Sequence, residues 1–193
     1  MRKLIYIVVL VVLSCNQKHT RNLVPNEITA QMILGNTNYQ AICYGGYRTN
    51  TRDKQPTIDE IKEDLKLLAA INIKVLRTYN VHYEEVSNLL KAITELKKEE
   101  PNFEMYVMLG AWIDCKNAWT NLPPIHHEES DRNAIEIAEA VRLTNQYPDI
   151  VKIIAVGNEA MVKWATSYYV TPNIILKWVN HLQNLKKENK LSK

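Results

Sequence analysis

Apolar positions along this chain follow two alternating periods. Four short apolar runs begin near residues 41, 73, 104 and 151, and behind each one apolar residues recur every three or four positions. The short runs indicate buried strands, and the longer period is typical of amphipathic helices. Four strand and helix pairs in a row predict a parallel sheet with right-handed crossovers.

Two of the predicted helices carry clear start signals. Thr57 and Glu60 have the spacing of a capping box, and Thr171 followed by Pro172 places a cap residue before a proline at the first helical position. The third helix is expected from about Asp131. The residues expected on its inner face are Ala134, Ile137, Ala138 and Val141.

The pattern favours one α/β architecture over another. The chain has five glycines, and none of them forms the Gly-rich turn that joins strand to helix in a Rossmann fold. The sequence therefore predicts the TIM (β/α)8-barrel type. A whole barrel takes about 250 residues, so we expect residues 38–193 to hold only the first four βα units, the N-terminal half of the barrel.

The start of the chain is expected to be an export signal. A basic start is followed by an apolar run from Leu4 to Leu13, which is shorter than the roughly 20 residues that a membrane-spanning helix needs. Ser14 before Cys15 resembles the lipobox of bacterial lipoproteins, which implies cleavage before Cys15 and acylation of its thiol. A plain secretory signal with a chance cysteine is the alternative. We expect a lipoprotein signal peptide (1–14), a polar tether (15–37) and an exported protein anchored to a bacterial membrane in the cell envelope.

Composition excludes some classes of protein. Lys and Arg number 24 against 21 Asp and Glu, a balance that argues against a nucleic-acid partner. Hydrophobic residues make up 46% and charged ones 23%, as in folded domains rather than disordered chains. Cys43 and Cys115 lie in or beside predicted buried strands, so we expect free thiols that pack as small hydrophobes.

Chemically active side chains gather at the ends of the predicted strands, where TIM barrels hold their active sites. The four segments are Tyr44–Arg48, Arg77–Asn80, Gly110–Asp114 and Gly157–Ala160. Aromatic faces beside directed hydrogen-bonding groups suit a sugar ring. A carboxylic acid after an apolar strand, such as Glu159, can have its pKa raised by desolvation, which suits protonation of a glycosidic oxygen.

The order and spacing of these segments resemble glycoside hydrolase family 17, the β-1,3-glucanases and related glucan enzymes. Val156–Ala160 is similar to the acid/base motif after the fourth strand, and Asp64-Leu65 and the other segments are similar to bacterial members. The resemblance covers roughly residues 38–190. It implies a retaining mechanism, a β-glucan or related oligosaccharide as substrate, and no metal or other cofactor.

By position, the resemblance implies that Glu159 is the general acid/base, and that Asn158 bonds the sugar 2-hydroxyl. The substrate-binding residues that it implies are Asn158, Arg77, Tyr79, Tyr44 and Trp112. In this set Arg77 and Tyr79 shape the floor of the cleft, and the other two aromatic residues stack on glucosyl rings. Pairing of Arg77 with a buried carboxylate is an equally good interpretation.

Other notable residues have simpler interpretations. Trp178 is expected in the core. Asp114 is expected to cap a helix or to be solvated, with assistance to the chemistry at the rim of the cleft as the alternative. Trp164 and Tyr168-Tyr169, after the fourth strand, fit loop packing and substrate contact equally. His126–Glu129 lacks the second histidine of a His-Glu-x-x-His motif, so we expect a solvated loop and no metal site.

The retaining mechanism uses two carboxylates roughly 5 Å apart, and the resemblance implies a nucleophilic glutamate after a seventh strand, in a Ser-Glu-Thr-Gly-Trp-like context. No glutamate followed by Gly-Trp occurs in the sequence, so we expect the chain alone to be inactive. Four alternatives stay open: the N-terminal part of a longer glucanase, a non-catalytic carbohydrate-binding or degenerate surface lipoprotein, two copies that close a barrel through exposed sheet edges, and a lipoprotein that binds another protein. The oligomeric state is not predicted.

Overall fold

The computed structural model of the chain describes residues 27–192. The expected signal peptide, the expected lipidation site Cys15 and the first part of the expected tether lie outside these residues. No helix within 27–192 has the length and apolar character needed to cross a bilayer.

A four-stranded parallel sheet forms the centre of the fold. Its strands are β1 (Gln40–Cys43), β2 (Ile73–Arg77), β3 (Tyr106–Ala111) and β6 (Val151–Val156), in the order β1-β2-β3-β6. The predicted α/β fold with a parallel sheet is confirmed. The described sheet is open, with β1 and β6 at its edges.

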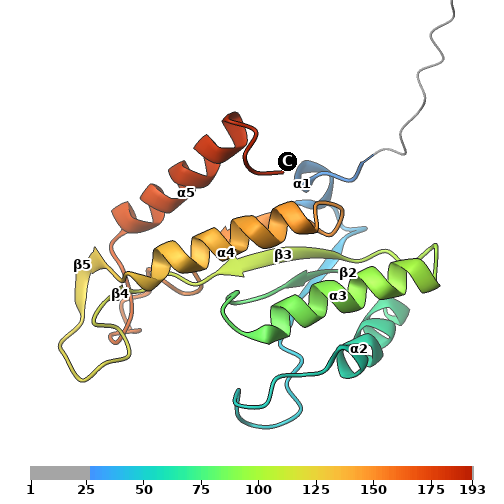
Figure 1. The fold of residues 1–193 in the computed structure, drawn as a ribbon, viewed down its shortest axis with the longest axis horizontal. Helices are drawn as coiled ribbons and strands as arrows, with labels where there is room; N and C mark the ends of the chain where they lie inside the picture. The colour runs from blue at the N-terminus through green and yellow to red at the C-terminus, as the bar shows by residue number, and fades with distance from the viewer. Residues whose placement is uncertain (1–26, 193) are drawn as a thin grey trace, which may run out of the picture.

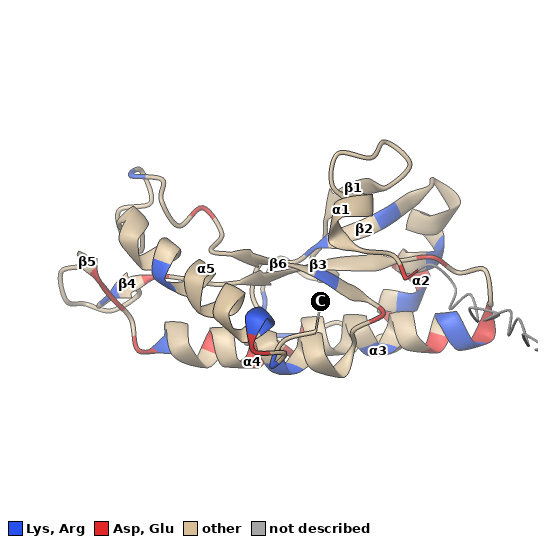
Figure 2. Ribbon diagram, turned by 90° about the horizontal axis from the view of Figure 1, so that it is seen from above, with Lys and Arg blue, Asp and Glu red and all other residues tan. Residues whose placement is uncertain are grey.

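Five helices accompany the sheet within residues 27–192. They are α1 (Ala30–Ile33), α2 (Ile58–Ala70), α3 (Glu84–Glu99), α4 (Arg132–Gln146) and α5 (Pro172–Lys187). Helices α3 and α4 lie along one face of the sheet, whereas α1 lies on the other face and α5 stands beside α4 (Figures 1 and 2). Ile33 of α1 packs with Val75 and Tyr106, so the end of the expected tether is part of the fold.

The predicted helix starts agree with the structure. Thr57 Oγ1 accepts from the Glu60 N–H (3.2 Å) and Glu60 Oε2 accepts from the Thr57 N–H (2.8 Å), which completes the capping box. Thr171 is the N-cap of α5, with Pro172 as its first residue. Trp178 on the inner side of α5 is buried, as expected.

The predicted inner face of α4 was partly wrong. Ile137 is buried, but Ala134 and Ala138 are exposed, and the polar residues Asn133 and Glu136 are buried in their place. The reason is that both polar side chains accept hydrogen bonds from backbone N–H groups at the strand ends. The pattern of apolar residues cannot reveal a helix face on which buried polar residues make hydrogen bonds.

Between β3 and α4 the chain forms a two-stranded antiparallel hairpin of β4 (Cys115–Lys116) and β5 (Ile125–Glu129). The solvated loop expected at residues 126–129 is therefore a strand. His126 stacks on Tyr169 (3.6 Å between ring centroids), and Glu129 accepts a hydrogen bond from Trp178 Nε1 (2.8 Å), so these contacts anchor the hairpin. Within residues 27–192, no group of three His, Cys, Asp or Glu side chains could hold a metal ion.

The two cysteines of the described chain are free, as expected. Cys115 is buried, but Cys43 is exposed, because β1 is an edge strand whose residues all face solvent in part. The expectation of two buried thiols therefore holds for Cys115 alone.

Candidate active site

A cleft of about 950 Å³ opens at the carboxyl ends of β2, β3 and β6. This volume lies within the range of roughly 300–1,000 Å³ typical of ligand pockets. Its lining includes four of the residues expected from the sequence, namely Tyr79, Trp112, Asn158 and Glu159. The ends of parallel strands thus bring together side chains that are far apart in the sequence.

Glu159 projects from a tight turn directly after β6. Gly157 has φ of 80° and Glu159 has φ of 49°, a left-handed conformation that costs a residue with a side chain about 1–3 kcal/mol and is found most often at functional sites. A Cβ on Gly157 would lie 2.9 Å from the Ala160 Cβ, so glycine is needed there. The Glu159 side chain is exposed, so the burial expected for this carboxyl group is not found in the described chain.

Tyr168 orients the Glu159 carboxylate. Its hydroxyl donates to Glu159 Oε2 over 3.4 Å. Burial, together with the negative charge of Glu159, raises the pKa of the Tyr168 phenol, so Tyr168 keeps its proton and remains a donor.

Arg77 binds an amide and not a carboxylate. Its Nη2 donates to Asn158 Oδ1 (3.1 Å), and its guanidinium lies 5.9 Å from the centre of the Tyr79 ring. Among the described residues it forms no ion pair within 4.0 Å, so the expected partner carboxylate is not found. Because Arg77 fixes the oxygen of Asn158, the Asn158 NH₂ group is left to donate to a ligand in the cleft.

The structure does not bring Tyr44 into the cleft lining. Tyr44 is buried, and its hydroxyl donates to Asp64 Oδ2 (2.9 Å), which also accepts from Arg48 Nη1 (2.8 Å). Burial and the Asp64 carboxylate raise the pKa of Tyr44 well above its ordinary value. A Cβ on Gly46 would lie 2.4 Å from the Tyr44 hydroxyl oxygen, so Tyr44 supports the loop above it.

Three aromatic rings form one wall of the cleft. Tyr168 lies 5.2 Å from Trp112 and 5.0 Å from Trp119 between ring centroids, and Trp112 lies 6.2 Å from Trp119. Sequence reasoning proposed Trp112 and left Tyr168 open, but it missed Trp119. The available signal was a tryptophan within an otherwise polar loop. Trp164 is exposed and outside the cleft lining.

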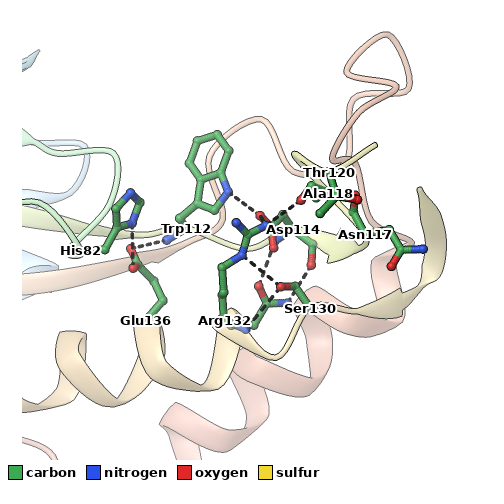
Figure 3. A network of polar contacts seen from close by, with 10 residues as sticks. His82, Trp112, Asp114, Asn117, Ala118, Thr120, Ser130, Arg132 and Glu136 are labelled. Atoms are coloured by element: carbon green, nitrogen blue, oxygen red, sulfur yellow. Dashed lines mark hydrogen bonds and ion pairs between the residues drawn. The ribbon is translucent and has the colours of Figure 1, made fainter. Parts of the chain in front are cut away.

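A buried polar network supports this wall from below (Figure 3). Asp114 is only 2% exposed; its Oδ2 accepts from Arg132 Nη2 (2.8 Å) and from Trp112 Nε1 (3.3 Å). Burial raises the pKa of Asp114 in spite of the neighbouring Arg132 guanidinium. The solvated or capping role expected for Asp114 is wrong, since the N-cap of α4 is Asp131 and the Asp114 carboxylate is enclosed.

Glu136 ties two strand ends to α4. Its Oε1 accepts from the Val81 N–H (2.6 Å) and the Trp112 N–H (3.0 Å), and its Oε2 lies 3.1 Å from His82 Nδ1. Both carboxylates of the network, Asp114 and Glu136, are thus engaged by protein groups. Glu159 is the one carboxylate in the described cleft lining that receives only a hydroxyl hydrogen bond.

A further buried carboxyl group lies near the cleft, in the first turn of α3. Burial raises the pKa of Glu85 to about 7, and the Gly46 backbone N–H opposes this shift. Its Oε1 has no hydrogen-bond partner among the described residues, and neither has Oδ1 of Asn80 or Oδ1 of Asp114, two residues of the cleft lining.

No protein-family model matches this chain, and no curated protein matches it. Among solved structures, the crystal structure of an endo-laminarinase from Formosa Hel1_33_131 is similar, with 66% sequence identity and a TM-score of 0.85. The alignment covers 86% of this chain and 42% of that chain, so this chain spans less than half the length of that protein. The two chains share a fold over the aligned part.

Proposed function

We propose that this chain forms part of a glycoside hydrolase that acts on β-1,3-glucan, of the kind found in glycoside hydrolase family 17. The observation that carries this proposal is the position of Glu159, an exposed carboxylate at the end of β6 in a cleft walled by aromatic rings. The 66% identity to an endo-laminarinase, a β-1,3-glucanase, supports the same substrate class.

The chemistry assigned to Glu159 is proton transfer. As an acid it protonates the glycosidic oxygen of the leaving sugar, and as a carboxylate it then takes a proton from the attacking water. The Tyr168 hydroxyl holds one carboxylate oxygen. Asn158, fixed by Arg77, presents its amide NH₂ to the sugar 2-hydroxyl.

A retaining mechanism also needs a nucleophilic carboxylate roughly 5 Å from the acid/base. Asp114 and Glu136 are poor candidates because the first is bound to Arg132 and the second to two backbone N–H groups. We propose that the nucleophile belongs to a segment outside the four described βα units. The open edge of β6 is where a TIM barrel would continue.

A non-catalytic carbohydrate-binding role is the second candidate. The observation that favours it is that Glu159 is the only carboxylate in the described cleft lining that is not engaged in a charged or backbone contact. A cleft with one such group and an aromatic wall can bind sugar without cleaving it.

Affinity electrophoresis in gels that contain laminarin, xylan or an α-glucan tests the substrate class. We expect laminarin alone to retard the chain, and equal mobility in all gels would overturn a β-1,3-glucan ligand. Because the proposed nucleophile lies outside the four described βα units, reducing-end release from laminarin is then measured on a fusion of this chain with the part of the similar endo-laminarinase that lies outside the alignment, and this measurement separates the two candidates. The hydrolase is supported if release falls about 10²- to 10⁴-fold in Glu159→Gln but not in the matched variant Glu128→Gln on β5. Binding without release supports the binding role.

We also propose that the protein is exported and anchored to a membrane by lipid on Cys15. The basic start, the apolar run to Leu13 and the small Ser14 support this. Cys15→Ser should abolish palmitate labelling and move the protein from the membrane fraction to the soluble one. Unchanged labelling of that variant would refute the anchor.

A further inference from the structure

Trp119 has an exposed ring that the proposed chemistry does not use. Its side chain is 57% exposed although it lines the cleft, so a large apolar surface faces water. Its φ is 62°, in the left-handed region that bulky residues rarely adopt. Such strain persists where the surroundings hold it, and it clusters at ligand-binding sites.

The turn that carries Trp119 is held by several hydrogen bonds (Figure 3). Thr120 Oγ1 and the Thr120 N–H both donate to the Asn117 carbonyl oxygen (2.8 and 3.2 Å), and Asn117 itself has φ of 63°. Arg132 Nη2 donates to the Ala118 carbonyl oxygen (3.0 Å) while it also pairs with Asp114. The ion pair between Arg132 and the buried Asp114 therefore supports both Trp112 and the residue before Trp119.

The position of Trp119 relative to Glu159 is also defined. Trp119 stacks on Tyr168 with an angle of 22° between the rings, and the Tyr168 hydroxyl reaches Glu159. One tyrosine thus separates the exposed indole from the carboxylate. Tyr168 covers one face of the indole, so the opposite face is left for a ligand.

We propose that Trp119 forms a stacking subsite for a sugar ring, placed along the cleft from the sugar that contacts Glu159. This subsite rests on the β-1,3-glucan specificity proposed above and makes it depend on chain length. The apolar face of a pyranose matches the flat indole. Because the turn is held before a ligand arrives, little conformational entropy is lost on binding.

Isothermal titration of the chain with laminaritriose and laminarihexaose tests the subsite. Trp119→Ala should weaken hexaose binding about 10- to 100-fold, the effect of losing one buried aromatic contact, and should change triose binding less than about threefold. Trp119→Phe, which keeps a ring, should recover part of the loss. Trp164→Ala removes a tryptophan that is more exposed (70%) but lies outside the cleft lining, and it should leave both affinities unchanged.

The outcomes separate the subsite from the proposed substrate. Unchanged hexaose binding in Trp119→Ala, or an equal loss for both sugars, overturns the subsite while β-1,3-glucan binding stands. If the wild-type chain binds oligosaccharides of another β-glucan but not laminari-oligosaccharides, and Trp119→Ala weakens that binding, the subsite stands and the proposed substrate falls. Absence of binding to any of these sugars by the wild-type chain overturns both.

Discussion

Glu136 offers the sharpest test of how the cleft is held together. Its Oε1 accepts from two backbone N–H groups, those of Val81 and Trp112, and its side chain is a buried part of the cleft lining. In Glu136→Leu both donors lose their acceptor in a buried place. Each unsatisfied donor costs about 1–3 kcal/mol, so we expect the free energy of unfolding to fall by about 2–6 kcal/mol.

The matched variant is Glu136→Gln, which keeps an acceptor oxygen and loses only the charge. Because a hydrogen bond to a charged group is worth about 0.5–1.5 kcal/mol more than a neutral one and Glu136 accepts two backbone bonds, a loss of roughly 1–3 kcal/mol is expected. Urea unfolding followed by circular dichroism measures both variants. The near-ultraviolet signal should change more in the leucine variant, because Trp112 loses its backbone anchor. Equal stability of the two variants would refute the role of Glu136 as a backbone acceptor.

Three further predictions concern Glu85, Gly110 and Arg77. Burial raises the pKa of Glu85 from 4.5 to about 7, so the folded state holds this proton when the unfolded state has lost it. The stabilisation that this group provides is complete below pH 4.5 and is lost as the pH rises through about 7. The loss amounts to about 3 kcal/mol in the free energy of unfolding. Urea unfolding measured against pH should show this change in the wild-type chain but not in Glu85→Gln. Gly110→Ala should destabilise the chain by about 3 kcal/mol or more, because the new Cβ would lie 2.3 Å from the Thr78 carbonyl oxygen. The midpoint of thermal unfolding should therefore fall, and a midpoint equal to that of the wild type would contradict this packing. In Arg77→Met, Asn158 is no longer oriented by the guanidinium, so glucan binding should weaken about tenfold, the effect of losing one charged hydrogen bond. Calorimetry that finds equal affinity in the variant and the wild type would show that Arg77 does not position the amide.

The strands and helix starts could be predicted because their signals are local. Apolar runs of four to six residues and the Thr57 capping box depend on neighbours in the sequence, and the structure keeps them. The position of Glu159 at a strand end followed from strand order alone. Its exposure did not, because that depends on which segments cover the end of β6.

The missed features are those that depend on contacts between distant segments. Glu136 is buried because it meets backbone N–H groups from two strand ends, a contact that helical periodicity cannot encode. Tyr44 was expected in the cleft, but it bonds Asp64, twenty positions away, and lies outside the cleft lining. Trp119 acquires its place only when the Ala118 carbonyl meets Arg132 of α4.

The edge position of β6 has a consequence for amide hydrogen exchange. In a parallel ladder, alternate N–H groups of a strand point to opposite neighbours, and among the described residues β6 has a neighbour on the β3 side alone. Amides of β6 that point to β3 are therefore protected, while those between them exchange with solvent. Any strand that pairs with this edge, whether from the same protein or another copy, would slow the second set and leave the first unchanged. The exchange rates of the amides in residues 151–156 therefore show whether a further strand pairs with this edge of the sheet.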